Sequence, residues 1–403
     1  MIVRRGYSPT LTVHIVGIAY ACVRMLIGAF SVAYLIRAGL SLPQIGLLKS
    51  FQAAVIVFID IPLSYFSDHY SRKFSIALSV LFSAIWLALT GISEGFYGFL
   101  LAEFFNALSL GMMSGTFSAY LYDVSKSEGA DHQAVTIFAR YQKNQFFFMG
   151  IASLLGAGVF TLEPRLAWFM AALLMSVVLL ITWFLPSDNF FKAPKDRAMM
   201  GRLKADMASM REVFRQNGQV GQAVILLALG YGLVLQSLIQ YWQVLADIEH
   251  GNLPLGVLLG AVFFVVLMAQ SLSGKVIESL HGTSWLKVIS YLGLVATVLV
   301  MALSFVIPSL VVLYLVLAFF SCSLLSSLSG AFIVKMAPPH LRSTFLSGFA
   351  TVGKIIMFVT MPIIAGLIGS SGVWFFLIAF VLLVLTSGFL FGTAAEVQKE
   401  SSL

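Results

Sequence analysis

The chain has 403 residues, of which 60% are apolar and only 10% are charged, whereas about 25% of the residues in a soluble domain are charged. This composition excludes an ordinary soluble enzyme, and two cysteines that each lie alone in an apolar run, Cys22 and Cys322, exclude a disulfide scaffold or a thiolate metal cluster. The net charge of +7 comes from Lys and Arg residues spread among short segments, so it does not indicate a nucleic-acid-binding surface.

Twelve apolar runs are long enough to cross a membrane as α-helices, because one crossing takes about 20 mostly apolar residues. The first run is too long for the core of a signal peptide and lacks a small-residue cleavage site, so we expect it to be retained. We therefore predict an all-α polytopic membrane protein. The approximate limits of the runs are 12–37, 44–66, 74–92, 96–122, 138–162, 166–186, 219–246, 253–275, 284–307, 309–335, 344–368 and 372–393.

Basic residues between the runs indicate how the helices are oriented. If the N-terminus is cytoplasmic, the opposite side carries few basic residues, namely Arg37, Lys49 and Arg165. The positive-inside rule then places both termini on the cytoplasmic side of the plasma (inner) membrane. The basic residues of the cytoplasmic side are Arg4, Arg5, Arg72, Lys73, Lys126, Arg140, the basic run from Lys192 to Arg215, Lys275, Lys287, Lys335, Arg342 and Lys399.

The longest connection divides the runs into six and six. A faint repeat with an offset of roughly 210 residues, which places a small residue four positions before both Asp68 and Glu278, supports two pseudo-symmetric halves. The predicted parts are an N-terminal six-helix bundle at 1–186, a cytoplasmic linker at 187–218 and a C-terminal six-helix bundle at 219–403.

The linker contains a predicted amphipathic helix, because apolar residues recur at helical spacing opposite basic residues. Such a helix lies on the anionic cytoplasmic leaflet of the membrane. The alternative is a solvated linker in which the periodicity arises by chance. The apolar residues are Leu203, Met207, Met210 and Phe214, and the basic residues are Arg202, Lys204, Arg211 and Arg215.

The connection between the second and third runs reads SDHYSRK at 67–73. Together with the twelve runs, their division into six and six and the long basic linker, this segment resembles the major facilitator superfamily, whose loop pattern reads roughly G-x-x-x-D-x-x-G-R-K. Asp68, Arg72 and Lys73 match this pattern, whereas serines replace its two glycines.

Two further segments, Asp60-Ile-Pro62 and Leu-Tyr122-Asp123, resemble a large bacterial branch of the family that is mostly efflux-like. The family's antiporter signature, a Gly-Pro cluster in the fifth helix, is matched only in part, which weakens the case for drug–proton antiport. The chain has glycines without the proline, at Gly150, Gly156 and Gly158.

The resemblance implies that Asp68 faces the N-terminus of the eleventh helix and holds a cytoplasmic gate closed in the outward-open state. An acid at a helix N-terminus contributes about 0.3–1 kcal/mol, enough to bias two states that differ by a few kcal/mol. Arg72 and Lys73 belong to the same gating segment. The alternative is that these three charges only set the topology of the chain.

Ionisable residues inside the predicted spans are candidates for function, because each is costly at bilayer depth unless it is paired or wet. Arg24 lies about 18 Å from the cytoplasmic end of the first run, and Glu103 lies about 10 Å below the outer face in the fourth, at nearly the same depth. We therefore expect them to pair. In the resembled fold the first, fourth, seventh and tenth helices line a central cavity, which implies that Arg24, Glu103 and its neighbour Asn106 bind substrate there.

The seventh run carries a polar stripe of Gln236, Gln240 and Gln243, spaced so that they share one helix face. Lipid would not tolerate this stripe, so we expect it to be wet and to contact substrate. The alternative is that the amides, with a buried Arg24–Glu103 pair, only hold helices together.

Two lysines within the fifth and eleventh runs, Lys143 and Lys354, add positive charge from both halves. With Arg24 they outnumber Glu103, which favours a substrate with a carboxylate or phosphate group. For Lys143 the alternative is snorkelling to the cytoplasmic interface. Asp60 either pairs with Lys143 or titrates during transport, and both interpretations remain open.

Proton coupling takes a carboxylate that is desolvated in one state and next to an arginine in another. Glu103 is the first candidate and Asp60 the second. We predict a secondary active transporter that moves a small organic solute, with an anion favoured, by alternating access with proton coupling. Multidrug efflux of hydrophobic or cationic compounds is the alternative within transport.

A membrane-embedded enzyme is the alternative from another class, and it is disfavoured because the six His residues lie singly in loops and at helix ends. A G-x-x-x-x-G-K match that ends at Lys354 is not a nucleotide site, since Ile355 replaces the required Ser or Thr. We expect a monomer in membrane lipid, with no catalytic residues, no cofactor, no metal site and no nucleic-acid partner.

Overall fold

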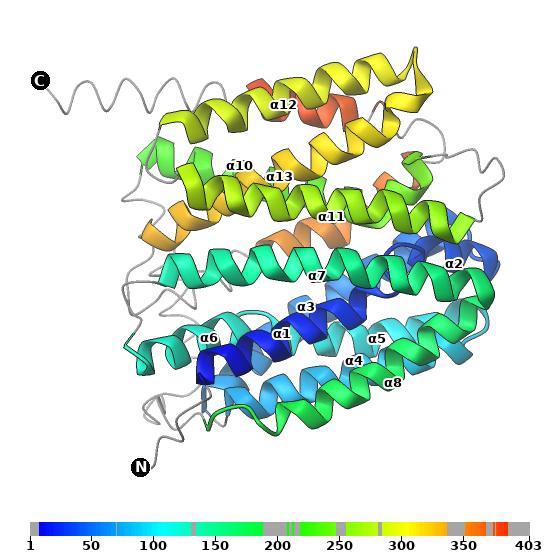
Figure 1. Cartoon of the computed structure of the whole chain (residues 1–403). Helices are drawn as coiled ribbons and strands as arrows, with labels where there is room; N and C mark the ends of the chain where they lie inside the picture. Colours follow the sequence, from blue (N-terminus) through cyan, green and yellow to red (C-terminus); the bar gives the residue numbers. More distant parts are fainter. Residues whose placement is uncertain are drawn as a thin grey trace, which may run out of the picture. The chain divides into compact units, whose positions relative to one another are not determined.

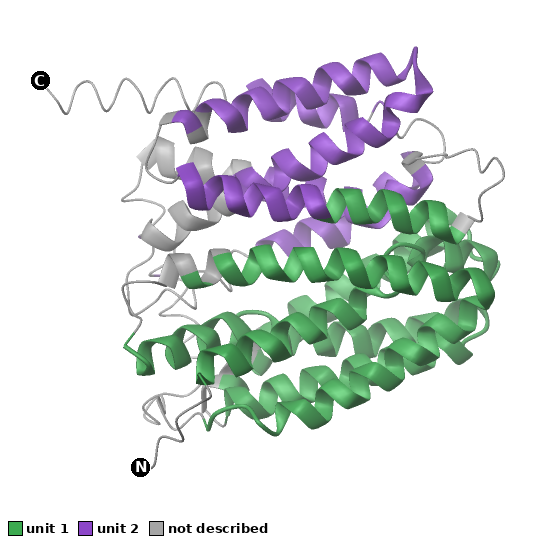
Figure 2. Ribbon diagram, in the orientation of Figure 1, with its two compact units in different colours: residues 1–197, 250–267 green, residues 198–249, 268–403 purple. Residues whose placement is uncertain are grey.

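The computed structural model of the chain consists of helices joined by connections, and no strand occurs in the part of the chain that it describes (Figure 1). The chain divides into two compact units, one formed by residues 1–197 and 250–267 and the other by 198–249 and 268–403 (Figure 2). The described residues are 8–69, 71–129, 134–187, 208, 212, 218–246, 255–280, 284–336, 351–367, 374 and 376–385.

The helices of the first unit begin with side-chain caps where the sequence supplies them. Ser8 caps α1 by accepting a hydrogen bond from the backbone N–H of Leu11 at 3.4 Å, and Ser71 caps α4 by accepting one from Phe74 N–H at 3.0 Å. These bonds satisfy N–H groups that have no partner within the helix. The helices are α1 (Pro9–Met25), α2 (Ser31–Arg37), α3 (Leu42–His69), α4 (Arg72–Ile92), α5 (Gly95–Met113), α6 (Thr116–Ser127), α7 (Ala134–Leu162), α8 (Pro164–Thr182) and the part of α11 (Leu255–Leu280) up to residue 267.

Two of the predicted runs form a pair of helices each. The run at 12–37 breaks between α1 and α2, and the run at 96–122 breaks between α5 and α6. At the second break Gly115 has a φ of 69°, a left-handed conformation that costs other residues about 1–2 kcal/mol. Each run is therefore interrupted, although Gly95–Ser127 still counts as one candidate membrane span. The first break places Arg24 at the end of α1.

Small side chains on α4 allow close packing at the centre of the first unit. Ser75, Ser79 and Ser83 follow one another at every fourth position and are all buried. In membrane proteins such small residues let helix backbones approach closely. The helix packs against α5 and α8, and α5 also packs against α3.

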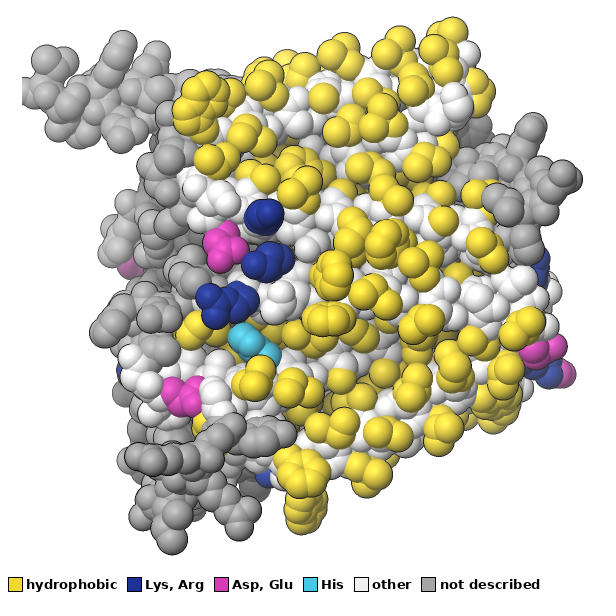
Figure 3. Space-filling view, in the orientation of Figure 1, with side chains coloured by type: hydrophobic (Ala, Val, Ile, Leu, Met, Phe, Trp, Pro, Cys, Tyr) yellow, Lys and Arg dark blue, Asp and Glu magenta, His cyan; other side chains and the backbone are white. Residues whose placement is uncertain are grey.

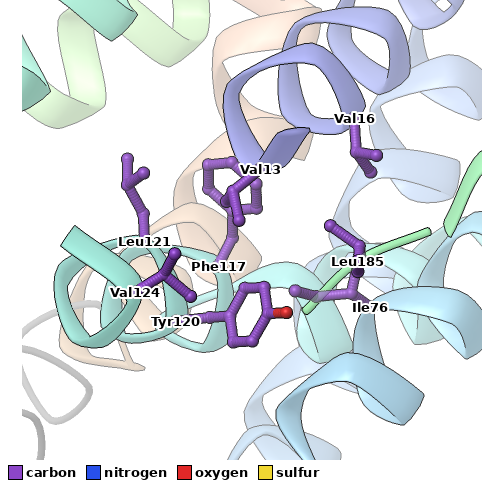
Figure 4. Close-up of a cluster of buried hydrophobic side chains, with 8 residues drawn as sticks. All are labelled: Val13, Val16, Ile76, Phe117, Tyr120, Leu121, Val124 and Leu185. Carbon is purple, nitrogen blue, oxygen red and sulfur yellow. The ribbon is translucent and has the colours of Figure 1, made fainter. Parts of the chain in front are cut away.

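A cluster of buried apolar side chains joins α1, α4 and α6 beside residue 185 (Figure 4). Next to it, the hydroxyl of Tyr120 donates a hydrogen bond to the backbone carbonyl of Pro186 at 2.5 Å. This packing fixes α1 against α4 about two helical turns from Arg24. The members of the cluster are Val13, Val16, Ile76, Phe117, Tyr120, Leu121, Val124 and Leu185.

The second unit is built around α13, which packs against both α10 and α12. A buried hydrogen bond from Gln270 Nε2 to Ser323 Oγ, 2.8 Å long, joins α11 to α13. The elements of this unit are α10 (Gly218–Ala246), the remainder of α11, α12 (Ser284–Ser304), a short 3-10 helix (Pro308–Leu310), α13 (Val311–Met336) and the helical segments Thr351–Leu367 and Phe376–Leu385.

Among the described residues, seven helices are long and apolar enough to cross a membrane. This agrees with the predicted class of all-α polytopic membrane protein, while twelve helices in two six-helix bundles and the boundary at 187–218 stay predictions. The amphipathic helix predicted at 203–214 lies outside the described residues, apart from positions 208 and 212, which are helical. Shorter apolar helices are Pro9–Met25, Val288–Ser304, Thr351–Leu367 and Phe376–Leu385.

Candidate functional site

Arg24 lies in the last turn of α1, where the C-terminal carbonyl groups of a helix carry partial negative charge and stabilise a cation. Its Nη1 donates a hydrogen bond to Ser83 Oγ at 3.0 Å, and its Nη2 donates one to Asn106 Oδ1 at 2.6 Å. The guanidinium carbon lies 4.3 Å from the centre of the Trp86 ring and 5.5 Å from that of Tyr20, which is a cation–π arrangement. Arg24 is therefore held by neutral groups.

Glu103 and Asn106 lie three positions apart on α5 and are buried, with 6% and 2% of their surface exposed. Asn106 Nδ2 donates a hydrogen bond to Glu103 Oε2 at 2.9 Å, while Asn106 Oδ1 accepts the one from Arg24. The structure thus corrects the expected direct pair of Arg24 and Glu103, because the amide of Asn106 lies between them.

Lys49, on α3, forms the ion pair that we expected Arg24 to form. Its Nζ lies 2.8 Å from Glu103 Oε1, and only 12% of its side chain is exposed. The distribution of basic residues in the sequence assigns Lys49 to the side of the membrane opposite the cytoplasm. The structure places Lys49 about 10 Å into α3, at 1.5 Å per residue from Leu42.

A second set of hydrogen bonds holds the same helices one turn further along. The hydroxyls of Tyr20 and Ser109 lie 2.8 Å apart, and Ser79 Oγ donates to the backbone carbonyl of Ser109 at 2.8 Å. These contacts connect α1, α4 and α5, so they keep Arg24 in register with Asn106.

The contacts define a charged network, which consists of Lys49, Glu103, Asn106, Arg24 and Ser83 in order of contact. Two cations and one carboxylate give it a formal charge of +1. Charged groups at bilayer depth are costly unless they are paired or wet. An excess cation whose direct partners are neutral is a site where a carboxylate or phosphate group can bind.

Three predicted site residues belong to the second unit. Gln236 and Gln240 lie half-buried on α10, and Lys354 lies half-buried in the helical segment Thr351–Leu367. The contribution of these residues to one site with the charged network stays a prediction.

Asp60 and Lys143 belong to the first unit but are not in the charged network. Asp60 is buried on α3 with 3% of its surface exposed, and Lys143 lies half-buried on α7. Their pairing with each other, and a role for Asp60 in proton coupling, stay predictions.

The predicted gating segment has contacts within the first unit. Arg72, at the start of α4, pairs with Asp123 of α6. Lys73 Nζ donates hydrogen bonds to the carbonyls of Trp183 and Leu185, at 2.8 and 2.6 Å, beyond the C-terminal end of α8. Both cations therefore tie helix ends together, while the side chain of Asp68 lies outside the described residues and its gating role stays a prediction.

A hollow of about 440 Å³ lies elsewhere in the first unit and is lined by both basic and acidic residues, including Tyr34, Arg37 and Glu163. At its edge Arg165 Nη2 lies 3.1 Å from Glu94 Oε1, but both side chains are exposed, and exposed pairs stabilise little. Within the described part of the chain, no three His, Cys, Asp or Glu side chains are placed to hold a metal ion.

A family model and a curated relative both match this chain over most of its length. The family described as the Major Facilitator Superfamily matches residues 13–361. An uncharacterized MFS-type transporter of Bacillus subtilis, YxaM, is 22% identical over 377 residues, which cover 89% of this chain and 90% of the relative.

Solved structures of low sequence identity share the fold. The nucleoside transporter NupG has a TM-score of 0.70 at 16% identity, with 96% of this chain and 99% of that chain covered. A POT family transporter in complex with 5-aminolevulinic acid has a TM-score of 0.75 at 11% identity, with 96% of each chain covered. A D-xylose-proton symporter has a TM-score of 0.68 at 12% identity, covering 95% of this chain and 96% of that chain.

Proposed function

The chain belongs to the Major Facilitator Superfamily and is a membrane transporter, not an enzyme, and from this premise we propose that it moves a small organic anion by alternating access with proton coupling. The charged network is the observation that carries the proposal. Its formal charge of +1 and the neutral partners of Arg24 favour an anionic group at this site.

The proposed architecture is two six-helix halves, 1–186 and 219–403, that rock about a site near the middle of the membrane. Both termini lie on the cytoplasmic side, and Asp68 closes the cytoplasmic gate. Gln236, Gln240 and Lys354 contribute to the site from the second half, and Lys143 adds charge from the first.

Glu103 is the proposed proton-coupling residue. It is buried and bonded to both Lys49 and Asn106, so loss of its charge on protonation changes the balance of the whole network. A protonated Glu103 leaves two uncompensated cations, which strengthens the binding of an anion. Proton and anion therefore favour each other at this site, and this mutual effect is reciprocal by linkage.

The proposal is tested by flux in proteoliposomes that contain an internal pH dye. Acetate, benzoate, succinate and phosphate are presented in turn, followed by the lipophilic cation tetraphenylphosphonium. We expect proton movement with at least one anion, loss of that movement in Arg24→Ala, and its retention in the control Lys126→Ala, which changes an exposed cation on α6.

Movement of protons with tetraphenylphosphonium alone would contradict the proposal. Efflux of hydrophobic or cationic compounds would then be the better account of this chain.

A further inference from the structure

Lys49 is an end member of the charged network, and Glu103 and Asn106 lie between it and Arg24. Its ammonium donates a hydrogen bond to Glu103 Oε1 at 2.8 Å, and its side chain is 12% exposed. An ammonium taken out of water at bilayer depth is costly unless an anion compensates it. Lys49 and Glu103 therefore stabilise each other as a pair on neighbouring helices, α3 and α5.

The ion pair of Lys49 and Glu103 changes the net charge that a ligand meets near Arg24. Without Lys49, the charge of Glu103 would offset that of Arg24 through the Asn106 bridge. With Lys49 in contact, Glu103 is already neutralised, and the positive charge of Arg24 remains.

The remaining N–H groups of Arg24 also favour an anionic ligand. Within the described residues its guanidinium donates to two neutral oxygens, those of Ser83 and Asn106. A guanidinium carries further N–H groups in a rigid planar fork that matches a carboxylate or a phosphate. The Trp86 ring lies over one face of the guanidinium, and the N–H groups lie in the guanidinium plane, so the ring does not occupy them.

We propose that Lys49 is a specificity-determining residue that makes the site select anions, because it neutralises Glu103 and leaves the charge of Arg24 to the substrate. This inference rests on the proposed function, since it names the source of anion selectivity at the same site. Lys49 acts through Glu103 and is a positioning residue, not a group that contacts substrate.

The test compares variants that differ in the charge of the network. Lys49→Met leaves one cation and one carboxylate, Lys49→Arg keeps the original balance, and Glu103→Gln leaves two cations without a carboxylate. The double variant Lys49→Met with Glu103→Gln has Arg24 as its single charge, so it regains the original balance without the lysine.

The measurement is the half-saturating concentration for exchange of a radiolabelled anion across proteoliposomes, because exchange does not require net proton movement. The probe is the anion among acetate, benzoate, succinate and phosphate that gives the largest proton movement with the unchanged protein. The control is Lys126→Met, which removes an exposed lysine of α6.

We expect Lys49→Met to raise the half-saturating concentration at least about tenfold, since one unit charge nearby in a partly buried site has an effect of that size. Lys49→Arg, Lys126→Met and the double variant should stay close to the unchanged protein, and Glu103→Gln should bind the anion more tightly. A lysine with a merely structural role would not be rescued by the second substitution in the double variant.

The inference is overturned if Lys49→Met binds the anion as the unchanged protein does, or if the double variant is as weak as Lys49→Met. If Lys49→Met does not fold, the test rests on Glu103→Gln, for which the inference predicts tighter anion binding. Unchanged or weaker anion binding in that variant overturns the inference. Absence of any anion exchange in the unchanged protein is a different result, and it contradicts the proposed function instead.

Discussion

Arg24 illustrates how neutral neighbours can hold a charged side chain without cancelling its charge. Ser83 and Asn106 accept its hydrogen bonds, and Trp86 and Tyr20 provide ring faces. Each contact orients the guanidinium, and none brings a negative charge into direct contact with it. The residue is therefore positioned and still able to attract an anion.

Replacing Trp86 tests whether the ring positions Arg24. A cation–π contact is worth about 2 kcal/mol when it is desolvated, so Trp86→Leu should raise the half-saturating anion concentration more than about tenfold. Trp86→Phe keeps a ring face and should lose less. Anion exchange in proteoliposomes measures both. Equal values for the Leu and Phe variants would show that the ring face does not matter.

Replacing Glu103 tests proton coupling. Glu103→Gln keeps the size of the side chain and a carbonyl that can accept from Lys49, but it has no proton to exchange between pH 5 and 8. We expect anion exchange to persist, whereas an imposed pH gradient no longer drives net anion movement. A pH-driven flux equal to that of the unchanged protein would assign coupling to another residue, and Asp60→Asn is the variant to measure next.

The sequence predicts part of the candidate site. Depth along the runs identifies Arg24 and Glu103, and helical spacing adds Asn106 to the same face. Lys49 is missed because it lies only five residues after the predicted start of its run, at residue 44. So close to an approximate boundary, the sequence alone does not distinguish a lysine inside the membrane from one in the preceding connection. The hydrogen bond to Ser83 depends on the packing of α1 against α4, and a single sequence carries no information on such contacts between distant segments.

The break between α1 and α2 is the element that sets the position of Arg24. After Leu26 the backbone changes to i→i−3 hydrogen bonds, from Gly28 N–H to Met25 and from Phe30 N–H to Ile27. The end of α1 then supplies the favourable helix dipole for the cation. α7 packs against α1, and Gly156 of α7 lies against the backbone of Leu26, so closely that a Cβ at this glycine would overlap the carbonyl group.

Substitution of Gly156 therefore should separate α7 from the break. Gly156→Ala forces a shift that typically costs about 1–3 kcal/mol, so we expect a lower apparent Tm for the purified protein in detergent. The matched control is Gly158→Ala on the same helix, where a Cβ would meet no atom within 4 Å. That variant should be as stable as the unchanged protein or slightly more stable, since alanine favours helix. Equal destabilisation by both substitutions would contradict this account of the break.

At the level of elements, hydropathy predicts the positions of α3 and α4 closely and misses interruptions within runs. The predicted run at 44–66 corresponds to α3 (Leu42–His69), and the run at 74–92 corresponds to α4 (Arg72–Ile92). The break after Met25 is missed because the residues around it are as apolar as the helix, and the break after Met113 is missed because Ser114, Gly115 and Thr116 are too few to interrupt the apolar run. A count of apolar residues does not report backbone dihedral angles. Gly115 is a signal for the second break, but glycine is also common inside membrane helices.

At the level of the whole molecule, the chain is a Major Facilitator Superfamily transporter whose described residues form helices and their connections. The family is predictable from the twelve runs, the long basic linker and Asp68, Arg72 and Lys73, because the family pattern consists of residue types at fixed spacings in the sequence. The substrate was not predictable in the same way. Solved relatives with this fold include a nucleoside transporter and a sugar–proton symporter, so the choice of solute depends on individual side chains within a shared architecture.

The proposed coupling through Glu103 implies a direction of transport relative to the proton. Protonation of Glu103 leaves Arg24 and Lys49 without a compensating carboxylate, so the proton and the anion should bind together and cross the membrane together. A gradient that is acidic outside should then drive the anion inward, independently of the orientation of the proteins in the bilayer.

The most direct measurement of the central claim is accumulation of the radiolabelled anion in proteoliposomes under an imposed pH gradient, acidic outside. The account predicts that the internal concentration exceeds the external one, that a protonophore collapses this accumulation, and that Arg24→Ala abolishes it while Lys126→Ala does not. Liposomes without protein provide the baseline for passive entry of the protonated acid. Equilibration without accumulation above that baseline would contradict proton-coupled transport of an anion by this protein.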